Sequence, residues 1–219
     1  MKQKIITQLR SITINLVKHS ISVAQNYPKI VGKDIVWNGF KDISFVLKKN
    51  TYEEIYSECL REKAFNFLLL DGAIVQMMYK FEGNNLHSHR LTFYSNPNIE
   101  RYQDIPENYE EKYYGNELFT EMIEERIIPF PLRFDFDRSE EKYIEFDHPF
   151  SHSSLGNYNN CRIPVCSPIS PNRFMQFILR SFYFDKYKEC FSNDTFNCEI
   201  RFPRTITESE TELLHFNFH

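Results

Sequence analysis

The sequence is poor in glycine, lacks long apolar runs and has no C-x2-C cysteine pair. Only 6 of its 219 residues are glycine, whereas 21 are phenylalanine and 13 are tyrosine. No apolar run reaches the roughly 20 residues that a membrane-spanning helix requires, so neither a membrane span nor a membrane partner is expected. Many aromatic residues with little glycine favour sheet surfaces over flexible linkers.

Cysteine usage and the N-terminus both predict a cytoplasmic protein. The five cysteines are odd in number, and Cys161 and Cys166 are the only two close in sequence. This usage is typical of thiols that pack as small residues in a reducing compartment. The C-x2-C spacing of a structural zinc site is absent. Residues 1–20 contain neither the apolar region nor the cleavage site of a secretory signal peptide.

The charge balance excludes one broad function class. The formal net charge is −4, so the chain is not a bulk electrostatic binder of nucleic acid or of anionic membranes. A local basic patch for a nucleic-acid strand stays possible. The 42% hydrophobic and 26% charged fractions are those of a soluble globular protein.

The first half of the chain predicts two helices and an antiparallel meander. Apolar spacing indicates a helix over residues 2–25, and Thr51 with Glu54 forms the capping box of a second helix. Two apolar segments flank Asp71-Gly72, which is a strong hairpin signal. A further turn at 83–85 leads to a third strand that ends at Tyr94.

The second half continues the sheet after an acidic, tyrosine-rich insertion at about 95–128. Residues 132–137 alternate between apolar and polar, which predicts a strand, and residues 142–146 are expected to return as its partner. Two short strands follow at 153–156 and 161–165, and Ser170-Pro171 begins a helix. The fold class is therefore α+β: residues 1–219 form a single domain, an antiparallel meander with the N-terminal and C-terminal helices on one face.

The segment from 132 to 162 carries the densest set of chemically able side chains. Asp135 and Asp137 share one strand face. With Glu145 or Asp147 they could form a carboxylate cluster for a divalent metal, or they are solvated residues beside a turn. The cofactor is therefore unknown, with a divalent metal possible.

His148 and His152 stand four residues apart on either side of Pro149. The pair could bind a transition metal, or act as acid and base while Arg162 steadies an anion. The other interpretation is that both imidazoles hydrogen-bond to the backbone. His87 and His89 are expected on one strand face, and they converge with the first pair only if the strands are neighbours.

Two binding surfaces are also candidates. Arg173 and Arg180 lie seven residues apart on one helix and, with Arg162, could bind the phosphates of a nucleic acid. An ordinary solvated helix face is the alternative. The insertion offers aromatic anchors for a protein partner. These anchors are Tyr102, Tyr109, Tyr113 and Tyr114.

The segments FNFLLLDGAIVQMMYKF, LRFDFD, HPFSHSSLG and CRIPV, with the helix SPNRFMQFILRSFY, resemble an uncharacterised bacterial family classed as a domain of unknown function. The resemblance covers most of the chain. More loosely, the layout resembles toxins of the TumE-like type. Arg133, Asp135, His148 and His152 match their pattern, although those proteins are shorter, lack the insertion and have more histidine after the proline.

The resemblance implies a component of a bacterial defence or toxin–antitoxin module. Such a protein would act with a partner encoded nearby or with nucleic acid. If it is catalytic, His148 and His152 would be acid and base, Asp135 would orient one of them and Arg162 would bind phosphate. The alternative is a non-enzymatic accessory subunit that binds protein or nucleic acid.

Overall fold

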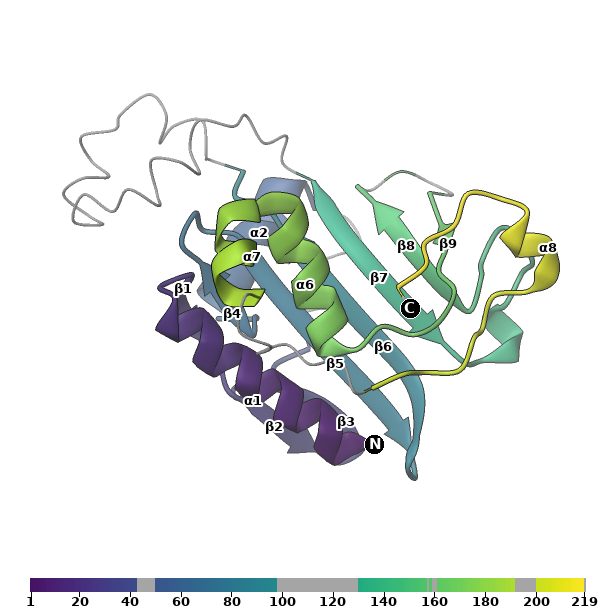
Figure 1. The fold of residues 1–219 in the computed structure, drawn as a ribbon, viewed down its shortest axis with the longest axis horizontal. Coiled ribbons are helices and arrows are strands. Elements are labelled where there is room, and N and C mark those ends of the chain that lie inside the picture. Colours follow the sequence, from purple (N-terminus) through teal and green to yellow (C-terminus); the bar gives the residue numbers. More distant parts are fainter. Residues whose placement is uncertain (43–49, 98–129, 157, 159–160, 192–199, 219) are drawn as a thin grey trace.

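The computed structural model describes residues 1–42, 50–97, 130–156, 158, 161–191 and 200–218 (Figure 1). The helices are α1 (Lys2–Lys18), α2 (Tyr52–Arg61), α6 (Pro171–Phe182), α7 (Phe184–Phe191) and α8 (Glu208–Thr211), with a 3-10 helix at Glu140–Lys142. The strands are β1 (Ser22–Gln25), β2 (Pro28–Val31), β3 (Asp34–Trp37), β4 (Phe67–Leu69), β5 (Ile74–Glu82), β6 (Asn85–Tyr94), β7 (Pro131–Asp137), β8 (Ser151–Leu155) and β9 (Ile163–Pro164).

All of these strands join one antiparallel sheet, which confirms the predicted α+β class. The sheet order is β1-β4-β5-β6-β7-β8-β9, and β3 pairs with β5 while β2 pairs with β3. From β5 to β8 each strand pairs with the next in sequence, so the centre of the sheet is a meander. Tyr94 pairs with Pro131, so the ends of the 95–130 connection meet on neighbouring strands. The single domain over 1–219 stays a prediction.

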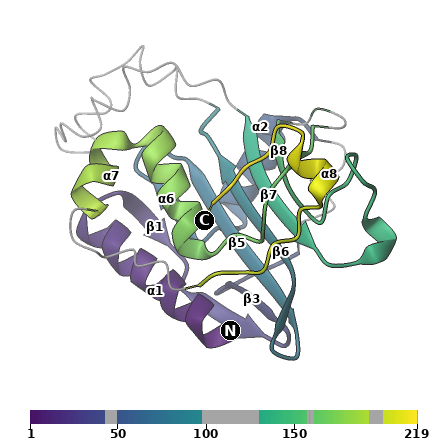
Figure 2. The same cartoon turned by 45° about the vertical axis from the view of Figure 1, so that its right-hand side comes forward.

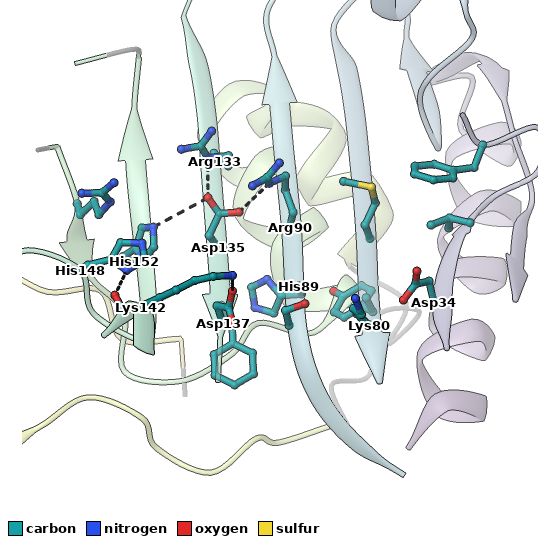
Figure 3. Close-up of a pocket in the computed structure, with 17 residues that line it drawn as sticks. Asp34, Lys80, His89, Arg90, Arg133, Asp135, Asp137, Lys142, His148 and His152 are labelled. Carbon is teal, nitrogen blue, oxygen red and sulfur yellow. Dashed lines mark hydrogen bonds and ion pairs between the residues drawn. The ribbon is translucent and has the colours of Figure 1, made fainter. Parts of the chain in front are cut away.

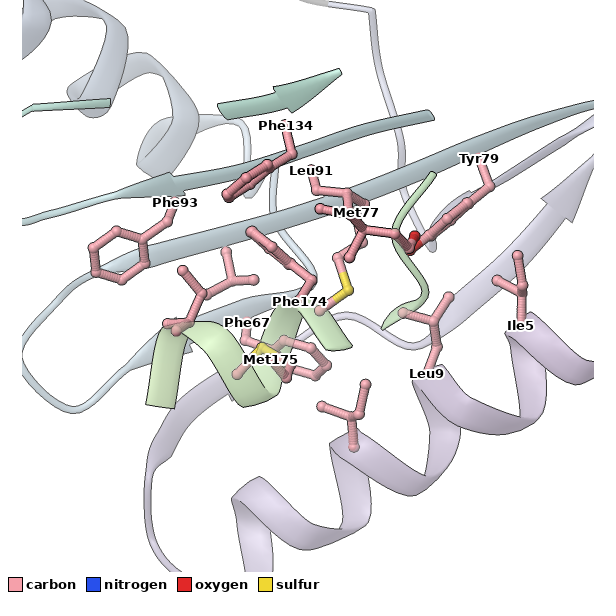
Figure 4. Packing of buried hydrophobic residues seen from close by; sticks show 14 of the residues in the cluster. Ile5, Leu9, Phe67, Met77, Tyr79, Leu91, Phe93, Phe134, Phe174 and Met175 are labelled. Atoms are coloured by element: carbon pink, nitrogen blue, oxygen red, sulfur yellow. The ribbon is translucent and has the colours of Figure 1, made fainter. Parts of the chain in front are cut away.

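Helices from the two ends of the chain cover the same face of the sheet, as predicted. α1 and α6 lie across this face with α7 beside α6 (Figures 1 and 2). Their apolar residues meet those of the central strands, among them Leu9, Met77 and Phe174 (Figure 4). Phe134 of β7 contacts Phe174 edge to face, with ring centroids 6.0 Å apart. This packing buries one whole side of the meander.

The opposite face is covered only in part by the described residues. A smaller cluster joins α2 to this face through Tyr56, Cys59, Ile74 and Tyr94. The capping box that starts α2 is formed, because Thr51 accepts from the Glu54 amide and Glu54 accepts from the Thr51 amide. Among the described residues, the side chains on the remaining part of this face are left to line a site.

The chemistry of the Asp71-Gly72 turn sets the register between β4 and β5. The Asp71-Gly72 hairpin joins β4 to β5, and the φ of Gly72 is +84°, a conformation that glycine adopts without strain. The Asp71 side chain accepts from the Ala73 amide at 2.9 Å, which closes the turn. Because side chains alternate with period two, the registers of the β5–β6 and β6–β7 pairs decide which residues of these strands face the side opposite α1 and α6.

Two local predictions were wrong. The first helix ends at Lys18 rather than near residue 25, because Ser20 takes a φ of +54° and the chain continues into β1. Residues 142–146 are not the partner of β7; β8 is that partner, and Ile144 makes only an isolated bridge to His148.

Candidate functional site

A row of polar side chains crosses the open face of the meander. The register aligns Met78, Arg90, Asp135 and His152 on four consecutive strands, β5 to β8. Figure 3 shows the charged members of this row and their neighbours side by side. Residues that are 62 positions apart in the sequence, Arg90 and His152, are thus brought onto one surface by strand pairing.

Asp135 is the central anion of this row. Its carboxylate pairs with the Nε atoms of Arg90 at 3.0 Å and Arg133 at 2.6 Å. Burial by itself raises the pKa of Asp135, but the two guanidinium groups outweigh burial and hold the pKa below its ordinary value. An ionised Asp135 therefore fixes two guanidinium groups side by side on the floor of the site.

Both predicted histidines direct one ring nitrogen to a backbone carbonyl. The Nδ1 atom of His152 lies 2.9 Å from the carbonyl oxygen of Pro149, and Nδ1 of His148 contacts the carbonyl oxygen of Lys142. A carbonyl only accepts hydrogen bonds, so in the neutral rings Nδ1 carries the proton and Nε2 keeps its lone pair. The two rings lie 5.0 Å apart between centroids. The prediction that they hydrogen-bond to backbone and the prediction of an acid–base pair are therefore compatible.

His152 has the environment of a base. Its side chain is buried on β8, and Nε2 lies 4.0 Å from Oδ2 of Asp135, too far for a hydrogen bond. Desolvation lowers the pKa of His152, and the nearby Asp135 opposes this shift only in part. The ring is therefore neutral near pH 7, and the Asp135 charge stabilises the imidazolium that forms when Nε2 takes a proton.

The proposed carboxylate cluster is not formed among the residues that the structure describes. Asp137 pairs with Lys142 at 2.5 Å and accepts from Ser139. Burial by itself raises the pKa of Asp137, but these hydrogen bonds lower it by a larger amount. The resulting pKa is about 2. Glu145 instead accepts from Ser209. In the described part of the chain no group of three or more His, Cys, Asp or Glu side chains is arranged to hold a metal ion.

Asp135, Asp137, His148 and His152 line a cleft of about 410 Å³. The cleft has more cationic than acidic side chains. The cationic ones are Lys80, Arg90, Arg133, Lys142 and Arg162, and the acidic ones are Asp34, Asp135 and Asp137. Arg162 donates to the carbonyl oxygen of Asp147 at 3.2 Å, which holds the guanidinium beside the two histidines. The predicted set of His148, His152, Asp135 and Arg162 is therefore assembled in one cleft that favours an anionic ligand.

The other two candidate histidines do not join this set through their side chains. A β-bulge interrupts β6 between Leu86 and Ser88, and His87 at the bulge faces Glu82, with Nδ1 3.6 Å from Oε2. The His89 ring lies in the core, where Nε2 accepts from the Ile169 amide at 3.0 Å. The four imidazoles therefore do not converge.

The three arginines proposed for nucleic acid fall on two sides of the sheet. Arg173 and Arg180 belong to α6, which packs against the face opposite the cleft, whereas Arg162 lines the cleft. Arg173 donates to Gln176, and Arg180 lies over the ring of Tyr187. They do not form one stripe with Arg162.

Tyr102, Tyr109, Tyr113 and Tyr114 lie outside the described residues, so the partner surface predicted there stays a prediction.

Sequence reasoning did not assign Arg90 or Lys80 to the site. The signal for Arg90 was present, because it shares the polar face of its strand with Ser88 and Thr92. Only the register between β6 and β7 sets Arg90 opposite Asp135. Lys80 joins the cleft in the same way, through its pairing with Ser88 on β6.

A family model described as "Uncharacterized conserved protein (DUF2290)" matches residues 17–218. The chain belongs to this family. The match includes every residue of the cleft, from Asp34 to Arg162. Neither the search of curated proteins nor the search of solved structures found a match. In the described residues, no helix of this family member is both long and apolar enough to span a membrane.

Proposed function

We propose that this DUF2290 protein is the effector of a bacterial toxin–antitoxin or defence module, and that its cleft acts on a phosphodiester or nucleotide in the cytoplasm. The observation that carries the chemistry is the pair of imidazoles, each with Nδ1 on a backbone carbonyl, beside the guanidinium groups of the cleft. The resemblance of Arg133, Asp135, His148 and His152 to the TumE-like pattern supports the toxin role. A protein partner encoded nearby would restrain it.

Each residue has a role in this chemistry. His152, whose pKa is lowered by burial, takes the proton of the attacking hydroxyl or water through Nε2. His148 acts in its imidazolium form: Nδ1 keeps its proton on the Lys142 carbonyl, and Nε2 gives its proton to the leaving oxygen and becomes neutral. Arg162, beside both rings, binds the phosphate oxygens and stabilises the charge that grows on them in the transition state. Asp135 holds Arg90 and Arg133 in place and favours the imidazolium form of His152.

The test is growth of a bacterial host after induced expression of the full chain and of the double variant His148→Asn/His152→Asn. Asparagine retains an N–H close to the position of Nδ1, so both contacts with backbone carbonyls can persist while Nε2 is lost. We expect arrest with the wild type and normal growth with the double variant at equal soluble protein. RNA and nucleotide pools from the arrested cells then identify the substrate.

The matched control is His87→Asn, the same chemical change at a histidine outside the cleft. It should arrest growth as the wild type does. Arrest by the double variant, with a melting temperature close to that of the wild type, would reject the assignment of these histidines. Absence of arrest and of cleavage by purified wild-type protein would reject the effector role.

The second candidate is a non-enzymatic subunit that binds an acidic partner protein. β2 pairs only with β3 among the described strands, and its Ile30 and Val31 are 46% and 50% exposed. Residues 1–33 contain six basic and no acidic residues. An exposed apolar edge strand accepts a strand from another chain, and the positive charge opposes pairing with a second copy.

This candidate predicts that Lys29→Glu/Lys33→Glu abolishes the effect of the chain in its host while His148→Asn/His152→Asn leaves it intact. Binding of the protein encoded nearby, measured by calorimetry, should be lost with the charge reversal. The control is Lys186→Glu/Lys188→Glu on α7, which changes charge equally away from β2. Equal binding by both charge-reversed proteins would exclude this edge as the partner surface.

A further inference from the structure

We infer that the cleft binds a single-stranded nucleic acid which runs across the strands from the histidines to a base-stacking position at Phe40. This inference rests on the proposed function and names its substrate class. It depends on three features of the cleft: its length, the charged side chains along it, and an exposed aromatic ring at the end far from His148 and His152.

The cleft is longer than a single nucleotide needs. It reaches from His152 on β8 across β7, β6 and β5 to Asp34 and Val36 on β3. Four interstrand spacings of about 4.8 Å give a length of about 19 Å. A stacked strand advances about 3.4 Å per nucleotide, so this length corresponds to between five and six stacked nucleotides, or to fewer where the strand is extended.

Charged side chains line this whole length. The end at Arg162, and the middle where Arg90 and Arg133 share Asp135, suit backbone phosphates. The far end contains Asp34 and, opposite it on β5, Lys80, and one carboxylate oxygen of Asp34 is buried without a donor among the described residues. Lys80 suits a further phosphate, and a carboxylate accepts hydrogen bonds from base amino groups. Figure 3 shows Asp34 and His148 at opposite ends of the row.

Phe40 supplies an aromatic surface at the far end. It follows β3, lines the cleft and is 36% exposed, and the Trp37 ring meets it in a T-shaped contact with centroids 5.1 Å apart. The T-shaped contact holds the ring, and the exposed part of the ring is available for stacking. Bases stack on such rings in proteins that bind single strands, and each stacked base contributes about 1–3 kcal/mol. In a duplex the bases are already stacked and paired, so this ring selects for single strands.

The test measures binding of fluorescein-labelled 12-nucleotide oligoadenylate RNA by anisotropy, at low salt. The full chain carries His148→Asn/His152→Asn to prevent cleavage. We expect Phe40→Leu, which keeps an apolar side chain, to weaken binding roughly fivefold or more. The matched control is Phe184→Leu on α7, a phenylalanine of 52% exposure away from the cleft, which should leave binding unchanged. AMP and a duplex of the same length should compete at least tenfold less well than unlabelled oligoadenylate.

Three results would overturn the inference: equal binding by the Phe40 and Phe184 variants, competition by the duplex equal to that of the single strand, or absence of oligonucleotide binding. Failure of the proposed chemistry is recognised separately. If oligonucleotide binding is tight and depends on Phe40 but the wild type cleaves nothing, the strand-binding site stands and the effector function is rejected. If the wild type cleaves a mononucleotide and Phe40→Leu does not change this activity, the proposed chemistry stands and the inference of a bound strand is rejected.

Discussion

The single substitution His152→Asn is expected to lower kcat/KM for the cleaved phosphodiester by roughly 10²- to 10⁴-fold, the usual contribution of a positioned general base. The side chain of asparagine can still donate to the Pro149 carbonyl, so the loop that carries His148 keeps its anchor. What disappears is the Nε2 lone pair beside Asp135. KM should change little, because the guanidinium groups that bind the phosphate are untouched. Activity of the His87→Asn protein should equal that of the wild type.

The pH profile separates a base from a merely structural histidine. A base works only when it is unprotonated, and burial lowers the pKa of His152 below its ordinary value of 6.5. The acid limb of kcat/KM for the wild type should therefore lie below pH 6.5, and it should be absent from the residual activity of His152→Asn. An unchanged acid limb in this variant would assign the limb to another group and remove His152 from the role of base.

The elements that follow local rules could be predicted from the sequence. Thr51 with Glu54 formed its capping box, and Asp71-Gly72 formed its hairpin. The alternation of residues 132–137 placed Phe134 in the core and Asp135 on the polar face. Each of these depends on a few neighbouring residues whose preferences agree with the fold, so local patterns sufficed.

The assembly of the cleft depends on non-local pairing, which no local pattern contains. Residues 142–146 contain Tyr, Ile and Phe, which strands favour, yet β8 pairs with β7, and this pairing makes His152 the neighbour of Asp135 rather than a loop residue. The β-bulge at His87, one extra residue in β6, likewise places the side chains of His87 and His89 in different surroundings. Arg90 became a partner of Asp135 only through the register of β6 and β7. Residue types could therefore be nominated from the sequence, but their contacts could not.

His89 has a consequence for stability rather than for catalysis. Desolvation lowers its pKa to about 4, since the ring is buried between Tyr79 and Phe136 and its Nε2 must stay unprotonated to accept from the Ile169 amide. In the unfolded chain the pKa is near 6.5. As the pH falls below 6.5 the unfolded state takes up this proton first, so stability present above pH 6.5 is lost progressively down to about pH 4.

We expect this one residue to remove about 3 kcal/mol of the free energy of unfolding between pH 7 and pH 4. His152 adds a loss of the same sign, so the difference between wild type and His89→Gln reports His89 alone. Glutamine can offer Oε1 to the Ile169 amide and does not titrate. Urea unfolding at both pH values should give a smaller pH dependence for His89→Gln than for wild type, whereas His87→Asn should retain the full dependence. Equal pH dependence in wild type and His89→Gln would show that the pKa of His89 is the same in the folded and unfolded chain, which would contradict a buried neutral ring that accepts from the Ile169 amide.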